Sequence, residues 1–130
     1  MSEAEEPSTP LEAYKAIIDH FVERSSSSVS ARNIELGSVP WIGAGPGEPE
    51  AKAVAEWTAS LSEDQRRLLA RLLRLERTES FHDALVSLEW WIACREVALT
   101  FRGEPMPVNF AEGMHCDFFG RLTGWEWPKE

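Results

Sequence analysis

The segment from Ser80 to Gly103 constrains the fold of this 130-residue chain more than any other part of it. At 100° per residue, its apolar side chains fall on two nearly opposite faces of a helix. One face holds Phe81, Leu85, Leu88, Ile92 and Leu99, and the other holds Val86, Trp90, Cys94, Val97 and Phe101. A helix that is apolar on both sides is buried between neighbouring elements. The pattern therefore predicts a long helix over residues 80–102, at the centre of a bundle and ended by Gly103 and Pro105.

Further helices are predicted on both sides of this segment from their start signals. In a capping box, an N-cap side chain and the side chain three residues later each accept a hydrogen bond from the other residue's backbone N–H. The start signals with this spacing are Thr9 with Glu12, Ser62 with Gln65, Ser80 with Asp83, and Asn109 with Glu112. Pro49 with Glu50 is a start signal of another kind, a proline at the first helical position. They predict three helices before the long one and a short helix after it.

Residues 25–49 form the longest predicted connection and are rich in Ser, Gly and Pro. A loop of this length inside a domain is uncommon, so the segment either is functional or contains short structure near Ile34 or Val39. Trp41 and Ile42 are expected to turn inward, because apolar side chains in a long loop are costly to leave in water.

The predicted fold class is all-α. It is a compact bundle of four to five helices around the central long helix, with one long loop and a minor two-stranded β pairing. Residues 106–110 and the alternating Trp125-Glu-Trp127 segment are the candidates for extended structure. We expect a flexible acidic tail over residues 1–8 and a single α-helical domain over residues 9–130.

Charge and cysteine content exclude several protein classes. The chain has 22 acidic and 13 basic residues, a formal net charge of -9, so it is no uniformly basic nucleic-acid binder. No apolar run approaches the ~20 residues that a membrane span requires. The acidic, polar N-terminus is unlike a signal peptide. Two cysteines 22 residues apart make neither a disulfide framework nor a CxxC zinc motif. We expect a reduced, cytoplasmic protein with no membrane or nucleic-acid partner.

Two Glu-x-x-His pairs invite a metal-site interpretation, because such pairs on facing helices build di-iron carboxylate sites. They are Glu79 with His82, and Glu112 with His115. Glutamate is common in this chain, so two such pairs arise readily by coincidence. Glu89 and Glu96 share the helix flank of His82, but residues seven apart are separated by about 10.5 Å along a helix, too far for one metal. We expect no metal and no cofactor.

Two other motifs match a known pattern only in part. The glycines of residues 43–47 are not followed by the Lys-Ser/Thr of a phosphate loop, so no nucleotide site is predicted. His115, Cys116 and Asp117 are the residue types of a thiol triad, but adjacent residues rarely converge. A structural role is favoured for Cys116. Cys94, on an apolar helix face, is expected to be inert.

Arginine and tryptophan residues supply the candidates for a partner-binding surface. Five arginines lie within residues 66–77 of a chain that is acidic elsewhere. Glu63 and Asp64 can pair with Arg67, while other guanidinium groups remain for carboxylate or phosphate recognition. A solvated, charge-balancing helix face and a Trp-rich core are the structural alternatives. The partner-binding candidates are Arg71, Arg74, Arg77, Trp91, Trp125 and Trp127.

These features favour a non-enzymatic protein–protein interaction module, similar to immunity or adaptor proteins by analogy only. The partner would be another protein, approached through an acidic surface, a tryptophan patch or the arginine face. The alternative is a small-ligand-binding protein or an enzyme with a pocket inside the bundle. Its candidate residues are His82, Glu89, Glu96, His115 and Cys116. A concave pocket that joins His82 and Glu89 to a histidine of another helix would favour this alternative.

Overall fold

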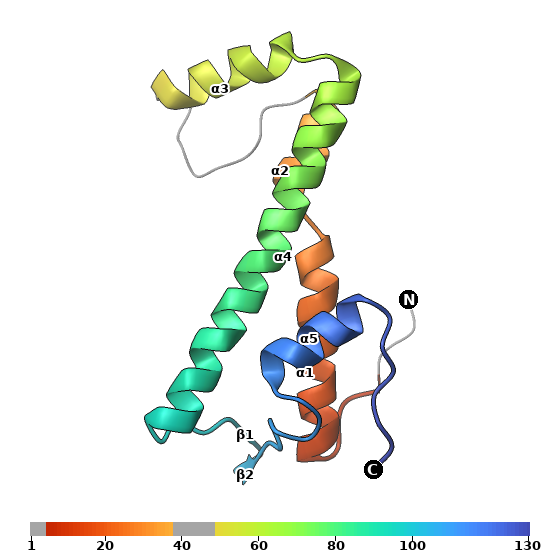
Figure 1. Cartoon of the computed structure of the whole chain (residues 1–130), viewed down its shortest axis with the longest axis vertical. Helices are drawn as coiled ribbons and strands as arrows, with labels where there is room; N and C mark the ends of the chain where they lie inside the picture. Colours follow the sequence, from red (N-terminus) through yellow and green to blue (C-terminus); the bar gives the residue numbers. More distant parts are fainter. Residues whose placement is uncertain (1–4, 38–48) are drawn as a thin grey trace. The chain divides into compact units, whose positions relative to one another are not determined.

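The computed structural model of the chain describes residues 5–37 and 49–130. Across these residues the elements are α1 (Pro10–Ser26), α2 (Val29–Glu35), α3 (Pro49–Ser60), α4 (Glu63–Cys94), β1 (Thr100–Phe101), β2 (Glu104–Pro105) and α5 (Met114–Leu122) (Figure 1). The mostly helical fold with one two-stranded antiparallel pairing is confirmed. No helix in this part of the chain is long and apolar enough to cross a membrane.

Both predicted capping boxes of the N-terminal half are present. Glu12 N–H donates to Thr9 Oγ1 at 3.1 Å, and Glu12 Oε2 accepts from Thr9 N–H at 3.2 Å. Ser62 and Gln65 make the equivalent pair at 3.2 and 2.9 Å. These reciprocal bonds satisfy backbone N–H groups that have no partner inside the helix, and they set the starts of α1 and α4.

The long helix has different ends from those predicted. α4 runs without interruption from Glu63 to Cys94, so the predicted helix start at Ser80 is wrong. Residues 75–80 contain no Gly or Pro, and a residue suited to an N-cap does not by itself stop a helix. The predicted end at Gly103 is also wrong, because α4 stops at Cys94 and residues 100–105 form the β1–β2 pairing.

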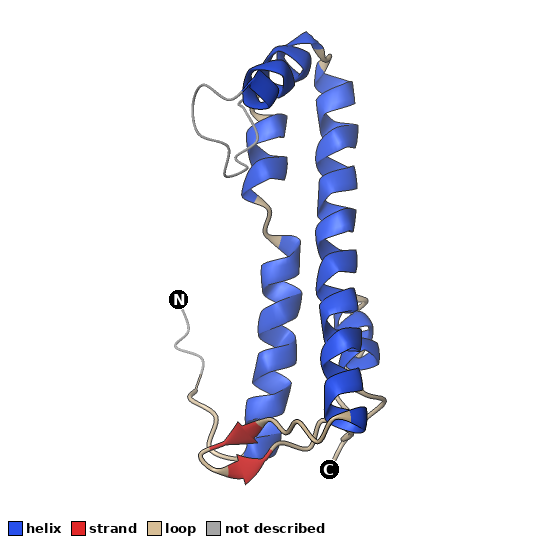
Figure 2. Ribbon diagram, turned by 90° about the vertical axis from the view of Figure 1, so that its left-hand side faces the viewer, coloured by secondary structure: helices blue, strands red, loops and turns tan. Residues whose placement is uncertain are grey.

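A β-hairpin occupies the place of the last predicted helical turns (Figure 2). Thr100 pairs with Pro105 and Phe101 with Glu104. The two residues between the strands, Arg102 and Gly103, have φ of 51° and 83°. Two successive positive φ angles are what a tight type I′ turn requires. Gly103 therefore turns a hairpin here and does not terminate a helix.

Residues that were predicted as loop contain α2, and the start of α5 is shifted. Ser28 is the N-cap of α2, accepting a hydrogen bond from Ala31 N–H at 3.1 Å, so the expectation of short structure near Ile34 is confirmed. α5 begins at Met114 after Gly113, which has no capping side chain, so the predicted cap at Asn109 is wrong. Residues 125–127 form no strand. The predictions for Val39, Trp41, Ile42 and residues 43–47 lie outside the described residues.

Contacts divide the chain into two units, each with its own apolar core. The first unit comprises Met1–Arg24 with Ser80–Glu130, and the second comprises Ser25–Glu79. The first core is formed by Tyr14, Ile18, Leu85, Met114 and Phe118, and the second by Ala31, Ile34 and Ala70. The tail over residues 1–8 and the single domain over residues 9–130 stay predictions.

Only one of the two predicted apolar faces of α4 is packed in the first unit. Leu85 is buried, and Phe81, Leu88 and Ile92 pack against the same core. On the opposite side, Val86 and Trp90 are exposed, as are Cys94 and Val97 beyond them. The prediction that both faces are buried is therefore wrong. Periodicity identifies an apolar face, but it does not supply the neighbour that covers it.

Candidate functional site

The side chain of Glu89, on α4, reaches the first turn of α5. Its Oε1 accepts a hydrogen bond from the backbone N–H of His115 at 3.0 Å, and its Oε2 contacts Nδ1 of the His115 ring. The N-cap residue of α5, Gly113, makes no side-chain cap of its own. A carboxylate from another helix therefore takes the place of a local N-cap, where it also meets the positive end of the helix dipole.

Gly113 is required for this approach. Its φ is 106°, a conformation that L side chains rarely adopt, and a Cβ at this position would lie 2.9 Å from Glu89 Oε1. The absence of a side chain thus gives the Glu89 carboxylate access to the start of α5.

His115 connects Glu89 to two further candidate residues. Its Nε2 lies 3.4 Å from the sulfur of Cys116, and its ring lies edge-on to that of His82 with the centroids 5.3 Å apart. The structure therefore brings His82, Glu89, His115 and Cys116 together within the first unit. Glu96, the remaining pocket candidate, lies exposed beyond the end of α4 with φ of 56°.

The order carboxylate, imidazole, thiol is that of a catalytic triad, although the imidazole of His115 and the thiol of Cys116 belong to neighbouring residues. Burial, and then the negative charges of Glu89, Glu112 and Asp117, raise the pKa of the Cys116 thiol. These effects disfavour the thiolate, which is the nucleophilic form. The arrangement therefore positions the Cys116 thiol beside the His115 imidazole in surroundings that favour the neutral thiol.

A buried polar pair lies next to this cluster and ties α1 to α5. The hydroxyl of Tyr14 donates to Asp117 Oδ2 at 2.5 Å, and Asp117 Oδ1 accepts from the backbone N–H of Glu112 at 3.0 Å. Tyr14 and Asp117 are each 1% exposed. Burial, followed by the hydrogen bond to Asp117, raises the pKa of Tyr14 well above its ordinary value of 10.0. The Tyr14 hydroxyl, which needs a hydrogen-bond partner when it is buried, was the signal in the sequence that could have indicated this pair.

Two of the tryptophan candidates hold the C-terminal segment in place. Trp127 Nε1 donates to Asp19 Oδ2 at 3.2 Å, and the ring packs edge-on against Tyr14 with centroids 5.8 Å apart. Arg121 binds Asp19 at 2.6 Å and the backbone carbonyl of Trp125 at 2.7 Å. Trp125 is half-buried beside Trp127. These contacts give both tryptophans a structural role inside the first unit.

The third tryptophan candidate, Trp91, is 51% exposed. It lies edge-on to Trp90, which is 48% exposed, with the ring centroids 5.4 Å apart. Val86 and Val97, which flank the pair in the sequence, are also exposed. We refer to Val86, Trp90, Trp91 and Val97 as the Trp90 patch.

The arginine candidates of α4 differ in their surroundings. Arg74 forms a two-pronged ion pair with Glu35 at 2.5 and 3.0 Å, which lowers the pKa of Glu35 and raises that of Arg74. Arg71 is exposed and Arg77 is half-buried. Arg67 pairs with Glu63 and Asp64 as predicted, at 2.6 and 3.3 Å. Much of the basic charge on this helix is therefore balanced locally.

Within residues 5–37 and 49–130, no group of three or more His, Cys, Asp or Glu side chains could hold a metal ion. The model of a family of unknown function (DUF6547) matches residues 7–129 of the chain. No curated protein and no solved structure matches the chain.

Proposed function

Because the chain belongs to the DUF6547 family of unknown function, we propose from its own geometry that it is a non-enzymatic protein–protein interaction module. The Trp90 patch is the surface that binds the partner. One observation carries the proposal: two adjacent tryptophans at the end of α4 are each about half exposed, and neither packs against the core of the first unit. Large exposed aromatic groups that lie together are typical of interaction sites.

The partner is a protein whose apolar contact region is bordered by Lys and Arg side chains. The first unit, which carries the Trp90 patch, has 14 acidic and six basic residues, a formal net charge of -8. The second unit has a formal net charge of only -1. Asp83 and Glu96 lie close in sequence to the patch and are exposed. Complementary charge would accelerate association, and the tryptophans would supply the buried contact.

The proposed setting is the cytoplasm, which the two free cysteines support. An acidic module of this kind would neutralise or recruit a basic protein. This mode of binding uses only the Trp90 patch and the acidic charge of the first unit. It therefore does not require the other candidates, which are Arg71, Arg74, Arg77, Trp125 and Trp127.

Replacement of the two patch tryptophans tests this proposal. In a pull-down from lysate of the source organism, Trp90→Ala with Trp91→Ala should reduce the captured partner roughly tenfold or more, because aromatic anchors dominate interface energies. Capture by the unchanged protein should also weaken as salt is raised from about 0.05 M to 0.5 M, because salt screens exposed charges.

The matched control is Leu68→Ala with Leu72→Ala, which removes two exposed apolar side chains from α4 in the second unit. This control variant should capture the partner as the unchanged protein does. Circular dichroism establishes that both variants remain helical. Equal capture by both variants would contradict the proposal, as would equal loss in both.

A second candidate function, an enzyme that uses the Cys116 thiol, is favoured by one observation: the contacts from Glu89 through His115 to Cys116. The raised pKa of Cys116 opposes it. We expect iodoacetamide at pH 7.5 to modify Cys116 in the Cys94→Ser variant roughly tenfold more slowly than it modifies Cys94 in the Cys116→Ser variant, because Cys94 is exposed. Faster modification of Cys116 would support the enzyme instead.

A further inference from the structure

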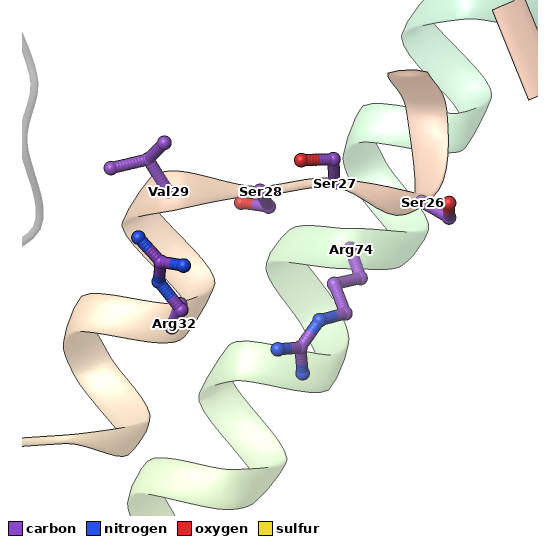
Figure 3. A pocket seen from close by; sticks show the side chains of 6 residues that line it. All are labelled: Ser26, Ser27, Ser28, Val29, Arg32 and Arg74. Carbon is purple, nitrogen blue, oxygen red and sulfur yellow. The ribbon is translucent and has the colours of Figure 1, made fainter. Parts of the chain in front are cut away.

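A small cavity in the second unit is lined by hydroxyl and guanidinium groups. Its volume is about 230 Å³, and its lining residues are Ser26, Ser27, Ser28, Val29, Arg32 and Arg74. Figure 3 shows Arg32 on α2 and Arg74 on α4, with the serine-containing link between α1 and α2 crossing above them. One apolar side chain among six makes this a polar site with two permanent positive charges.

The guanidinium group of Arg32 is available to bind an anionic ligand. It is exposed, and it has no ion-pair partner among the residues that the structure describes. A guanidinium group is always protonated at neutral pH and forms paired hydrogen bonds with carboxylate or phosphate oxygens.

Arg74 contributes the second group even though it is ion-paired. Its Nη1 and Nη2 each donate to one oxygen of Glu35. A guanidinium has five N–H donors, so three remain after this pair has formed. Glu35 thus anchors the Arg74 side chain at the edge of the cavity and leaves part of its donor set available.

The serine hydroxyls add neutral donors on another side. Ser28 Oγ accepts from Ala31 N–H, which leaves its own O–H to donate. Ser27 lies in the exposed link between α1 and α2. Several donor-bearing side chains thus line one space. Since liquid water occupies about 30 Å³ per molecule, the cavity has room for more than a phosphate group alone.

We propose that this cavity binds the phosphate group of a small phosphomonoester. Arg32 supplies the principal contact, Arg74 the second, and the hydroxyls of Ser27 and Ser28 bind the remaining oxygens. The near-neutral second unit is the part of this acidic chain where an anion meets least repulsion, because most of the net negative charge belongs to the first unit. This proposal is independent of the Trp90 patch.

Isothermal titration with glycerol 3-phosphate, and separately with inorganic phosphate, tests the site. The unchanged protein should bind glycerol 3-phosphate with a Kd of about 1 mM or tighter. Arg32→Gln should weaken binding about tenfold or more, because it removes a charge-assisted contact. Arg71→Gln is the matched control: it removes an exposed arginine that does not line the cavity, and it should leave Kd unchanged.

The two probes distinguish the source of the phosphate group. Tighter binding of glycerol 3-phosphate supports a phosphomonoester ligand, whereas equal or tighter binding of inorganic phosphate assigns the site to free phosphate and overturns the phosphomonoester. The site itself is overturned if neither probe binds, or if Arg32→Gln and Arg71→Gln weaken the binding of glycerol 3-phosphate equally. Backbone amide shifts in the NMR spectrum of the unchanged protein, expected at residues 26–32, provide a measurement that does not depend on any variant.

Discussion

Replacement of Phe118 by alanine is expected to lower the free energy of unfolding by about 3–5 kcal/mol. Phe118 lies on α5, is 0% exposed, and stacks on Phe81 of α4 with the ring centroids 6.3 Å apart. It also belongs to the core that joins α1, α4 and α5 in the first unit. The substitution removes a large apolar group from a closed site, so the lost burial is accompanied by a cavity.

Urea unfolding followed by circular dichroism measures this effect, and the neighbouring residue supplies the control. Phe119 is 59% exposed, so Phe119→Ala should change the free energy of unfolding by no more than about 0.5 kcal/mol. The two variants remove the same side chain from successive positions of one helix. Similar costs at both positions would show that α5 does not dock with Phe118 in the core.

Replacement of Asp117 by alanine should lower the free energy of unfolding by about 2–4 kcal/mol. It leaves two donors without their acceptor, the buried hydroxyl of Tyr14 and the part-buried backbone N–H of Glu112. Each unsatisfied buried group costs about 1–3 kcal/mol. The loss should also loosen the first turn of α5, where Glu89 binds His115.

A double-mutant cycle with Tyr14→Phe separates this pair from its surroundings. In the Tyr14→Phe background one of the two donors is absent, so Asp117→Ala should cost about 1–2 kcal/mol less than it does in the unchanged protein. Urea unfolding of the four proteins gives the coupling free energy. A coupling near zero would mean that the Tyr14 hydroxyl and the Asp117 carboxyl group do not interact in solution.

The contacts at the start of α5 also determine what the candidate site can do. Glu89 and Asp117 both accept hydrogen bonds from backbone N–H groups near this point, so they hold the helix as well as surround Cys116. Their charges raise the pKa of the thiol. The carboxylates of this cluster therefore bind the start of α5 and at the same time disfavour the thiolate form of Cys116.

Local chemistry was predictable from the sequence. The capping boxes at Thr9 and Ser62 depend on residues three positions apart, and the structure contains both. The inner face of α4 followed from periodicity, because Leu85 and its helical neighbours pack on the core. The helical class was predicted for the same reason, because short-range patterns largely specify secondary structure. A minor β pairing was also predicted, but it lies at residues 100–105 and not at 106–110 or 125–127.

Only the tertiary structure decided which apolar face is covered and which side chains meet. Trp90 and Leu85 look alike in a helical pattern, but the core contacts only the latter. Tyr14 and Asp117 are separated by 103 positions, and Glu89 and His115 by 26, so no local pattern pairs them. The sequence by itself determined the starts of α1, α3 and α4 and which residue types each face carries, because those depend on near neighbours. Packing determined burial and the site, because both depend on segments that meet only when the chain folds.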